Sequence, residues 1–231
     1  MPVKTKALQA AFPQTIPVLT GYLFLGIAYG IIMSSKGYGS GWTFLMSVFV
    51  YAGSAQYVAV TFLTSVFNPV NALLLTLMVN ARHIFYGIAM LDKYRDTGRF
   101  KPYLIFGLTD ETFSIVCSTD VPEGVDRQWY LFFITLLDHL YWVSGSVIGA
   151  LLGSMVTFNT KGLDFVLTAL FVVIFIGQWK SQRNHGAAVI GIVCSVICLL
   201  IFGPDRFIIP AMAAIVAMLS FFRGRIEGRN W

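Results

Sequence analysis

The sequence predicts an all-α integral membrane protein with about eight hydrophobic segments. Hydrophobic residues make up 57% of the 231 residues, and only 12% are charged, about half the share of a soluble domain. The apolar residues lie in runs long enough to cross a bilayer, for which a helix needs about 20 residues. The polar stretches between the runs are too short to form a soluble domain. We therefore expect residues 1–231 to be a single polytopic membrane domain.

The segments follow one another with short gaps where charged residues, Gly and Pro gather. The first begins near Thr15 behind only Lys4 and Lys6, is longer than a signal-peptide core, and should stay in the mature chain as a membrane helix. The net charge of +5 fits basic loops of a membrane protein better than nucleic-acid binding, so no nucleic-acid partner is expected. The eight predicted segments are 15–35, 41–66, 69–91, 103–118, 128–152, 163–179, 186–203 and 205–222.

Two of these segments are interrupted by polar residues and are predicted to be broken or re-entrant. Segment 41–66 has the sequence Ala-Gly-Ser-Ala-Gln at residues 52–56. Segment 103–118 is short and contains Gly107 and the run Thr-Asp-Glu-Thr at residues 109–112. A carboxylate in the middle of a membrane costs about 2.5–3.5 kcal/mol on insertion scales. Such residues are usual where broken helices line a cavity, so we expect breaks near Gly53 and Thr109.

The distribution of Lys and Arg among the loops narrows the topology. If all eight segments cross, the two sides carry eight and seven basic residues, which is no bias. If both interrupted segments return to the side they came from, the split becomes twelve against three, with both termini in the cytoplasm by the positive-inside rule. If only 103–118 returns, the split is eleven against four with the N-terminus outside. We favour the version with two hairpins.

A possible inverted-topology repeat relates residues 53–90 to residues 109–146. A shift of 56 residues places the first interrupted motif on the second, and it places the cluster His83–Tyr86 on His139–Trp142. Identities are few, so chance matching is the alternative. Inverted repeats place a substrate site near mid-membrane at their interface.

Six ionisable residues lie well inside apolar segments, where each needs a partner or a cavity. Helix spacing places Asn80 beside His83, and it places Tyr86 beside Arg82. The six are Arg82, His83, Asp110, Glu111, Asp138 and His139.

Structural roles compete with functional ones for all of these residues. Arg82 and a carboxylate could be a buried pair that only fixes helix register, and the histidines could be satisfied core residues. Asp110 could cap the second half-helix beside Thr109. Because adjacent carboxylates project about 100° apart on a helix, Asp110 and Glu111 cannot both be met by one Arg. At least one of them is then expected to face water or substrate.

The two predicted half-helix starts could form a site for a free amino acid. Exposed backbone amides after Ser54 and Thr109 suit a carboxylate, and a nearby acid suits an ammonium group. The predicted substrate-binding residues are Gly53, Ser54, Gln56, Asn80, Arg82, His83, Thr109, Asp110 and Glu111. The ion-coupling candidates are Asp110, Glu111, Asp138 and His139. No catalytic residue, metal site or cofactor is predicted.

Glycines at spacings of four form close-packing faces at Gly26 and Gly30 and at Gly145, Gly149 and Gly153. Either packing within the chain or docking of a partner subunit would use these faces.

Three motifs resemble the azaleucine-resistance (AzlC) family of bacterial inner-membrane permeases. They are Tyr-Ala-Gly-Ser-Ala-Gln-Tyr at 51–57, Arg-His with Tyr-Gly at 82–87, and Phe-Gly-Leu-Thr-Asp-Glu with Phe113 at 106–113. Order and spacing match from about residue 12 to 222. The family often has an acidic residue where this chain has Asn80, which argues against a charge-based role for position 80.

The resemblance implies a transporter that exports branched-chain or related hydrophobic amino acids: valine, leucine, isoleucine and possibly methionine. It also implies a bacterial inner-membrane location and a small partner subunit of the AzlD/YgaH type. The chain has no phosphate-binding loop of an ATPase, so an ion-coupled secondary mechanism is expected, with the proton as the candidate ion. The alternatives are an intramembrane enzyme, for which no catalytic spacing is present, and a non-transporting scaffold subunit.

Overall fold

The computed structural model describes residues 2–64, 66, 68–80, 82–155, 172, 175–176, 179–180, 185–203 and 207–227. Every element in these residues is helical. The chain divides into two compact units, Met1–Val166 and Leu167–Trp231, and each is described by itself. Of the predicted segments, 163–179 falls almost entirely outside the described residues.

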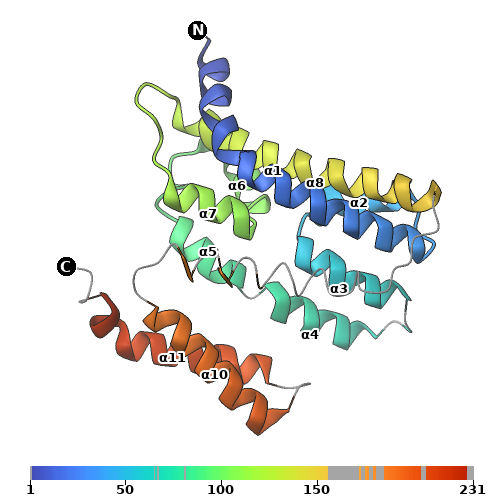
Figure 1. The fold of residues 1–231 in the computed structure, drawn as a ribbon. Helices are drawn as coiled ribbons and strands as arrows, with labels where there is room; N and C mark the ends of the chain where they lie inside the picture. Colours follow the sequence, from blue (N-terminus) through green and yellow to red (C-terminus); the bar gives the residue numbers. More distant parts are fainter. Residues whose placement is uncertain are drawn as a thin grey trace. The chain divides into compact units, whose positions relative to one another are not determined.

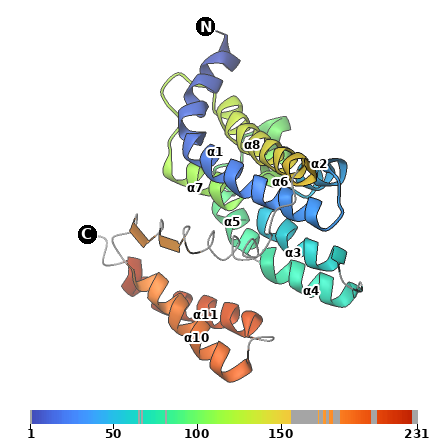
Figure 2. The same ribbon diagram turned by 45° about the vertical axis from the view of Figure 1, so that its right-hand side comes forward.

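In the first unit, the helices are α1 (Val3–Ser35), α2 (Ser40–Phe49), α3 (Gly53–Thr64), α4 (Pro69–Asn80), α5 (Arg82–Met90), the 3-10 turn η1 (Gly98–Phe100), α6 (Lys101–Phe106), α7 (Asp110–Ser118) and α8 (Arg127–Met155). The second unit contains α10 (Gly186–Phe202) and α11 (Ile208–Glu227), which pack against each other. Figures 1 and 2 show the helices of the first unit in two views.

Among the described residues, two helices are long and apolar enough to cross a membrane, α1 and α8, and α10 and part of α11 are shorter apolar helices. With 33 residues, α1 is roughly 50 Å long. It begins twelve residues before the predicted segment, because helical backbone continues past the apolar run into residues that carry Lys4 and Lys6. Predicted segment 128–152 corresponds closely to α8. The C-terminal helix α11 begins three residues later than predicted and extends five residues further.

The α1 and α8 helices run parallel and side by side (Figure 1), and glycines fix their close approach. A methyl group built on Gly26 would lie 2.9 Å from the Ser146 amide nitrogen, and one on Gly145 would lie 2.9 Å from the Tyr22 carbonyl oxygen. Real Cβ atoms do not approach backbone this closely. Of the two roles left open for these glycine faces, the structure shows packing within the chain.

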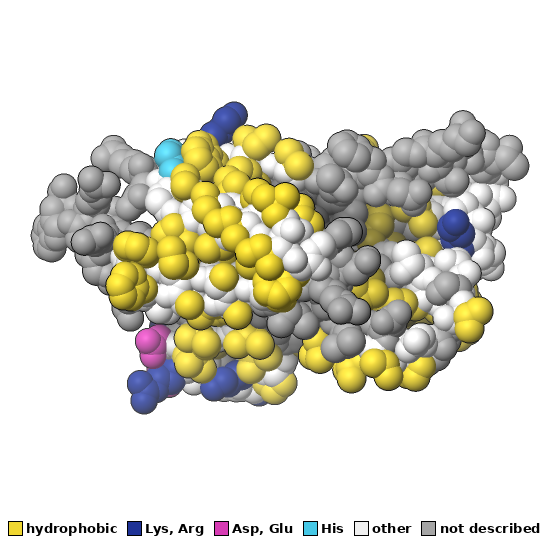
Figure 3. All heavy atoms as spheres, turned by 90° about the horizontal axis from the view of Figure 1, so that it is seen from below, with side chains coloured by type: hydrophobic (Ala, Val, Ile, Leu, Met, Phe, Trp, Pro, Cys, Tyr) yellow, Lys and Arg dark blue, Asp and Glu magenta, His cyan; other side chains and the backbone are white. Residues whose placement is uncertain are grey.

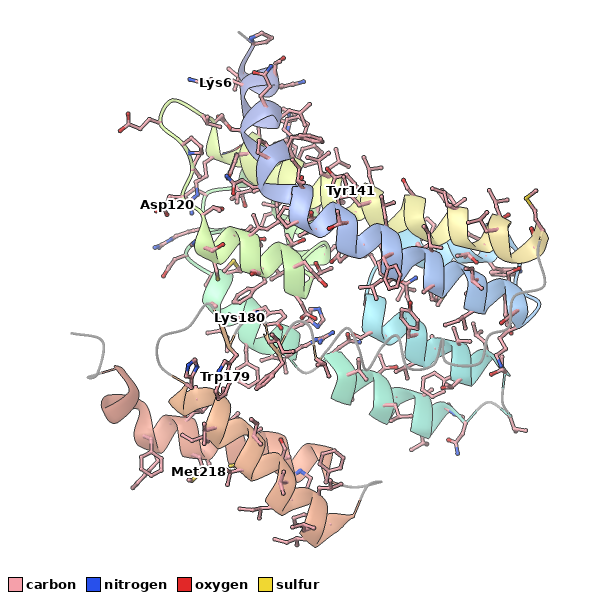
Figure 4. All side chains as sticks on the ribbon, in the orientation of Figure 1. Lys6, Asp120, Tyr141, Trp179, Lys180 and Met218 are labelled. Carbon is pink, nitrogen blue, oxygen red and sulfur yellow. The ribbon has the colours of Figure 1, made fainter. Side chains whose placement is uncertain are left out.

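Nearer the start of the same interface, the hydroxyl groups of Thr15 and Tyr141 are 3.2 Å apart. Figure 4 labels Tyr141 where α8 lies against α1. Polar contacts therefore accompany the glycine packing along this helix pair.

Both predicted breaks are confirmed. The α2 helix ends at Phe49 and α3 begins at Gly53, while α6 ends at Phe106 and α7 begins at Asp110. In the first break, Tyr51 has a φ of 40°, a left-handed conformation that non-glycine residues rarely adopt.

Each interrupted segment returns to the end of the unit from which it came. For the first, the Tyr38 hydroxyl, just before α2, donates to the carbonyl of Leu63 near the end of α3 at 2.7 Å. For the second, Lys93 Nζ, before α6, donates to the carbonyls of Val116 and Cys117 near the end of α7. Two hairpins result, as the loop charges favoured.

The basic residues Lys4, Lys6, Lys93, Arg99 and Arg127 gather at one end of the first unit, which we call the basic end. Lys4 Nζ lies 4.6 Å from the centre of the Trp129 ring, and Arg99 lies 5.9 Å from the same ring. Arg127 donates to the Lys93 carbonyl at 2.6 Å. Figure 4 labels Lys6 and Asp120 in this region. The 92–101 loop thus lies at the same end of this unit as the N-terminus, which is the arrangement of the version with two hairpins.

Large hydrophobic side chains lie on the surface in quantity, among them Phe24 (69% exposed) and Leu200 (80%). Figure 3 shows one face on which hydrophobic side chains cover much of the described surface and charged groups are few. Exposed apolar area of this extent is typical of contact with lipid.

Candidate functional site

The beginnings of α3 and α7 are joined through one side chain from α5. Arg82 donates a hydrogen bond to the Ser54 hydroxyl in the first turn of α3, and its Nη1 lies 2.9 Å from Asp110 Oδ2 in the first turn of α7. The two side chains are 27% and 15% exposed. Arg82 therefore pairs with a carboxylate, the contact that the structural alternative to a functional role described. We call Ser54, Arg82 and Asp110 the ion-pair cluster.

Aromatic rings border the ion-pair cluster. Tyr86, one turn after Arg82, stacks on Phe113 with ring centres 4.4 Å apart, and it lies within electrostatic reach of both Arg82 and Asp110. The His83 ring contacts Tyr86 edge-on at 5.6 Å.

A second set of polar groups begins at Glu111 and leads to α8. The Tyr22 hydroxyl from α1 lies 2.7 Å from Glu111 Oε2 and 2.7 Å from Thr109 Oγ1. The Thr109 and Thr112 hydroxyls are 3.1 Å apart, and Thr112 Oγ1 lies 2.7 Å from Asp138 Oδ2. We call these five residues the hydroxyl chain. The two adjacent carboxylates thus have separate partners, as the helix geometry required.

The cap of α7 is Thr109, whose hydroxyl accepts from the Thr112 amide at 3.3 Å. The alternative that assigned this cap to Asp110 is wrong, because Asp110 is already the first helical residue. In α3, the Gln56 amide bonds to the Ala52 carbonyl at 2.8 Å. The amides before it in that turn have no acceptor within the helix.

The predicted binding residues Gly53 and Gln56 are engaged with α8. Trp142 Nε1 donates to Gln56 Oε1 at 2.8 Å, and the Gln56 side chain donates to Ser47 at 3.3 Å. A methyl group on Gly53 would meet the Trp142 ring at 3.1 Å. Both residues therefore dock the first half-helix onto α8.

The histidines and Asn80 lie outside both clusters. His83 Nδ1 is 3.1 Å from the Asn80 carbonyl one turn earlier, as expected from their spacing. His139 Nδ1 is 3.0 Å from the Tyr103 hydroxyl, and its ring centre is 4.1 Å from that of Tyr51 in the first break. These contacts give His139 a packing role between α6, α8 and the break. Among the described residues, no group of three His, Cys, Asp or Glu side chains could hold a metal ion.

The sequence analysis missed Tyr22, which holds both Glu111 and the cap of α7. Its signal was present: Tyr22 stands one turn before Gly26 on the helix face that the glycines marked for close packing. Thr112 was noted only as part of a polar run, because no sequence pattern links it to Asp138.

Comparison with known proteins agrees with this description. A family model described as AzlC protein matches residues 17–156. The chain is 57% identical to the branched-chain amino acid transport protein AzlC of Bacillus subtilis, over 96% of this chain and 87% of the relative. It is 42% identical to an uncharacterized membrane protein of Haemophilus influenzae (96% and 92%) and 26% identical to the inner membrane protein YgaZ of Escherichia coli (74% and 72%). No solved structure matches.

Proposed function

The chain belongs to the AzlC family, and we propose on that basis that it is a bacterial inner-membrane transporter that exports branched-chain or related hydrophobic amino acids. Valine, leucine, isoleucine and methionine are the substrates to test. The relative with 57% identity is named a branched-chain amino acid transport protein, which supports the substrate class. Export is the proposed direction.

The observation that carries the proposal is the Arg82–Asp110 ion pair at the start of two half-helices. An amino acid zwitterion carries one carboxylate and one ammonium group, which complement the charges of Arg82 and Asp110. Its carboxylate would take the place of Asp110 at Arg82, next to the first amides of α3, and its ammonium group would bind Asp110. The apolar side chain would lie against Tyr86 and Phe113, which stack beside the pair.

Binding of this kind replaces one set of charge contacts by an equivalent set. The Arg82 and Asp110 side chains are each partly exposed, so a substrate can reach them without first uncovering a fully buried charge. The energy of separating the pair is offset by the two new ion pairs. This makes the site reversible, as a transporter needs.

We propose that the proton motive force drives export. Glu111 and Asp138 are the leading ion-coupling candidates, because each is a carboxyl group within the membrane domain that contacts a hydroxyl group, that of Tyr22 and that of Thr112 respectively. Asp110 then serves the substrate, and His139 has a packing role. We further propose a small partner subunit of the AzlD/YgaH type. Since the glycine faces of α1 and α8 are already occupied by each other, the partner would bind elsewhere.

Counterflow of labelled valine, leucine, isoleucine and methionine into liposomes tests the function, with the purified chain reconstituted alone and with the small partner. We expect uptake of chemically unchanged substrate, and loss of that uptake in Arg82→Gln. The matched control is Arg95→Gln, because Arg95 is an exposed loop residue. Absence of counterflow under both conditions would contradict the proposal and favour a scaffold, whereas an altered product would indicate an enzyme.

A further inference from the structure

Five side-chain oxygens in the first unit form an unbroken line between two carboxyl groups. In order they belong to Glu111, Tyr22, Thr109, Thr112 and Asp138. The four separations along the line are 2.7, 2.7, 3.1 and 2.7 Å. All four are hydrogen-bond distances between oxygen atoms. The line joins α1, α7 and α8, and it begins one residue after the carboxylate that pairs with Arg82.

A count of the hydrogens needed along this line shows how many of its two carboxyl groups are protonated. Four oxygen-to-oxygen contacts need four hydrogens, one in each contact. The three hydroxyl groups supply one hydrogen each, and an ionised carboxylate supplies none. Tyr22 in particular has one hydrogen for two contacts of 2.7 Å. The fourth hydrogen must be a carboxylic acid proton at one end of the line.

We propose that Glu111 and Asp138 share a single proton, which moves between them along the hydroxyl groups of Tyr22, Thr109 and Thr112. This inference rests on the proposed function, for which it supplies the coupling device. With the proton on Glu111, each hydroxyl donates toward Asp138. When the Glu111 proton passes to Tyr22, each hydroxyl passes its own hydrogen to the next oxygen, and the last reaches Asp138. Every hydroxyl is then restored and donates toward Glu111.

The burial of Asp138 supports the shared proton. Its side chain is fully buried, and its Oδ1 has no hydrogen-bond partner among the described residues. An ionised carboxylate there would be satisfied at one oxygen only, at a high desolvation cost. The protonated form removes that charge, and Thr112 remains its partner in either direction of the line.

With one shared proton, Glu111 and Asp138 together carry one negative charge. The charged and titratable groups around them come from several helices. Arg82 and Asp110 lie within electrostatic reach of Glu111, but they neutralise each other as an ion pair. The phenols of Tyr51, Tyr94 and Tyr103 lie within reach of Asp138. A zwitterionic substrate would bring an ammonium group to Asp110 and a carboxylate to Arg82, so its binding would change the charges beside Glu111 at one end of the line.

The shared proton can be tested without transport, by infrared absorption of protonated carboxyl groups near neutral pH in the purified full chain. We expect the band of one buried carboxylic acid in the unmodified protein. It should vanish in Asp138→Asn, because an amide hydrogen then fills the fourth contact and leaves Glu111 ionised. Glu111→Gln should remove it by the same count. Retention of the band in either variant would overturn the inference.

The path of the proton can be tested by transport. Thr112→Val removes the hydroxyl group at this position, and Thr112→Ser keeps it. Valine keeps the shape of threonine but has no hydroxyl. We expect accumulation driven by an imposed pH gradient to fall by about tenfold or more in Thr112→Val, while counterflow of labelled valine stays at the unmodified level. Thr112→Ser should restore the accumulation.

Thr135→Val is the matched control for this test, because Thr135 is equally buried and its hydroxyl donates only to its own helix, at the Leu131 carbonyl. It should behave as the unmodified protein in both assays. Undiminished gradient-driven accumulation in Thr112→Val would overturn the path. If the unmodified protein shows no counterflow at all, the proposed function fails instead, and the infrared result still decides whether the proton is shared.

Discussion

At the scale of single residues, the position of Arg82 accounts for the acidic residues around it. The guanidinium lies at the beginning of two helices, where the backbone dipoles are positive and a cation is unfavourable. Asp110 and Glu111 occupy the first turn of α7 and reverse the sign of that field. Asp110 then pairs with Arg82 directly, whereas Glu111 turns to the hydroxyl of Tyr22.

The Arg82–Asp110 pair predicts different effects of single and double changes. Asp110→Asn leaves the guanidinium without its counter-ion, and we expect it to lower the free energy of unfolding by about 1–3 kcal/mol. The double variant Arg82→Gln with Asp110→Asn should recover much of this loss, because no uncompensated charge remains. Thermal unfolding in detergent measures both. Neither variant should show counterflow.

The control for this pair is Asp96→Asn, an exposed carboxylate in the loop after α5, which should leave stability and counterflow unchanged. A double variant less stable than Asp110→Asn alone would contradict the account of Arg82 as the charge that needs compensation.

At the scale of helices, the packing of α1 on α8 positions Tyr22 and Trp142 and hence both clusters. Tyr22 meets Trp142 edge-on with ring centres 5.5 Å apart, and these rings lie next to the glycine contacts. The backbones approach so closely that Gly26, Gly30, Gly145 and Gly149 leave no space for a side chain. Stability and site geometry therefore depend on the same interface.

This interface predicts a contrast between two glycines of one helix. Gly30→Ala would drive a methyl group into the backbone of α8 around Ser146 and Ala150, so we expect a large loss of stability and of counterflow. Gly21→Ala has nothing within 4 Å. It should be neutral or stabilising by up to about 1 kcal/mol, since alanine favours helix more than glycine does.

Thermal unfolding of the two glycine variants, side by side, is the measurement. Equal stability of Gly21→Ala and Gly30→Ala would show that α1 and α8 do not approach as closely as described.

At the scale of the whole molecule, the first unit combines helices that run from one end to the other with two hairpins that do not. The α1 and α8 helices run away from the basic end. The α4 and α5 helices lead back towards it, because the chain passes from the Tyr38–Leu63 contact at the far end to Lys93 at the basic end. The hairpins begin at opposite ends, so α3 and α7 start in the interior and point in opposite directions. This arrangement supports the proposed inverted repeat.

The arrangement predicts which loops share a side of the membrane. In a background without Cys117, Cys194 and Cys198, single cysteines at Asp96 and Asp126 should react with an impermeant thiol reagent only from the cytoplasmic side. A cysteine at Gly37, at the far end of α1, should react only from outside. Labelling of positions 37 and 96 from the same side would contradict the hairpin topology.

The proposed repeat predicts that residues 53–90 and 109–146 superpose after rotation about an axis in the membrane plane. An experimental structure in lipid measures this directly. Two stretches that share one orientation, or that do not superpose, would show that the match at a shift of 56 was coincidence.

The sequence by itself determined the features that depend on local chemistry. Apolar runs predicted the helical membrane fold, and the polar run at 109–112 and the small residues at 52–56 predicted both breaks. The charge of Arg82 predicted that it needs a partner or a cavity, and left open which. The family resemblance is also confirmed. Only the tertiary structure decided which partner each group has. Asp110 rather than Glu111 meets Arg82, Thr109 rather than Asp110 caps α7, and Tyr22 from a helix 87 residues earlier joins Thr109 to Glu111. The physical reason is that polar residues within a membrane must find partners wherever the packing brings them, and the close approach of α1 to α8 sets that geometry between segments far apart in the chain.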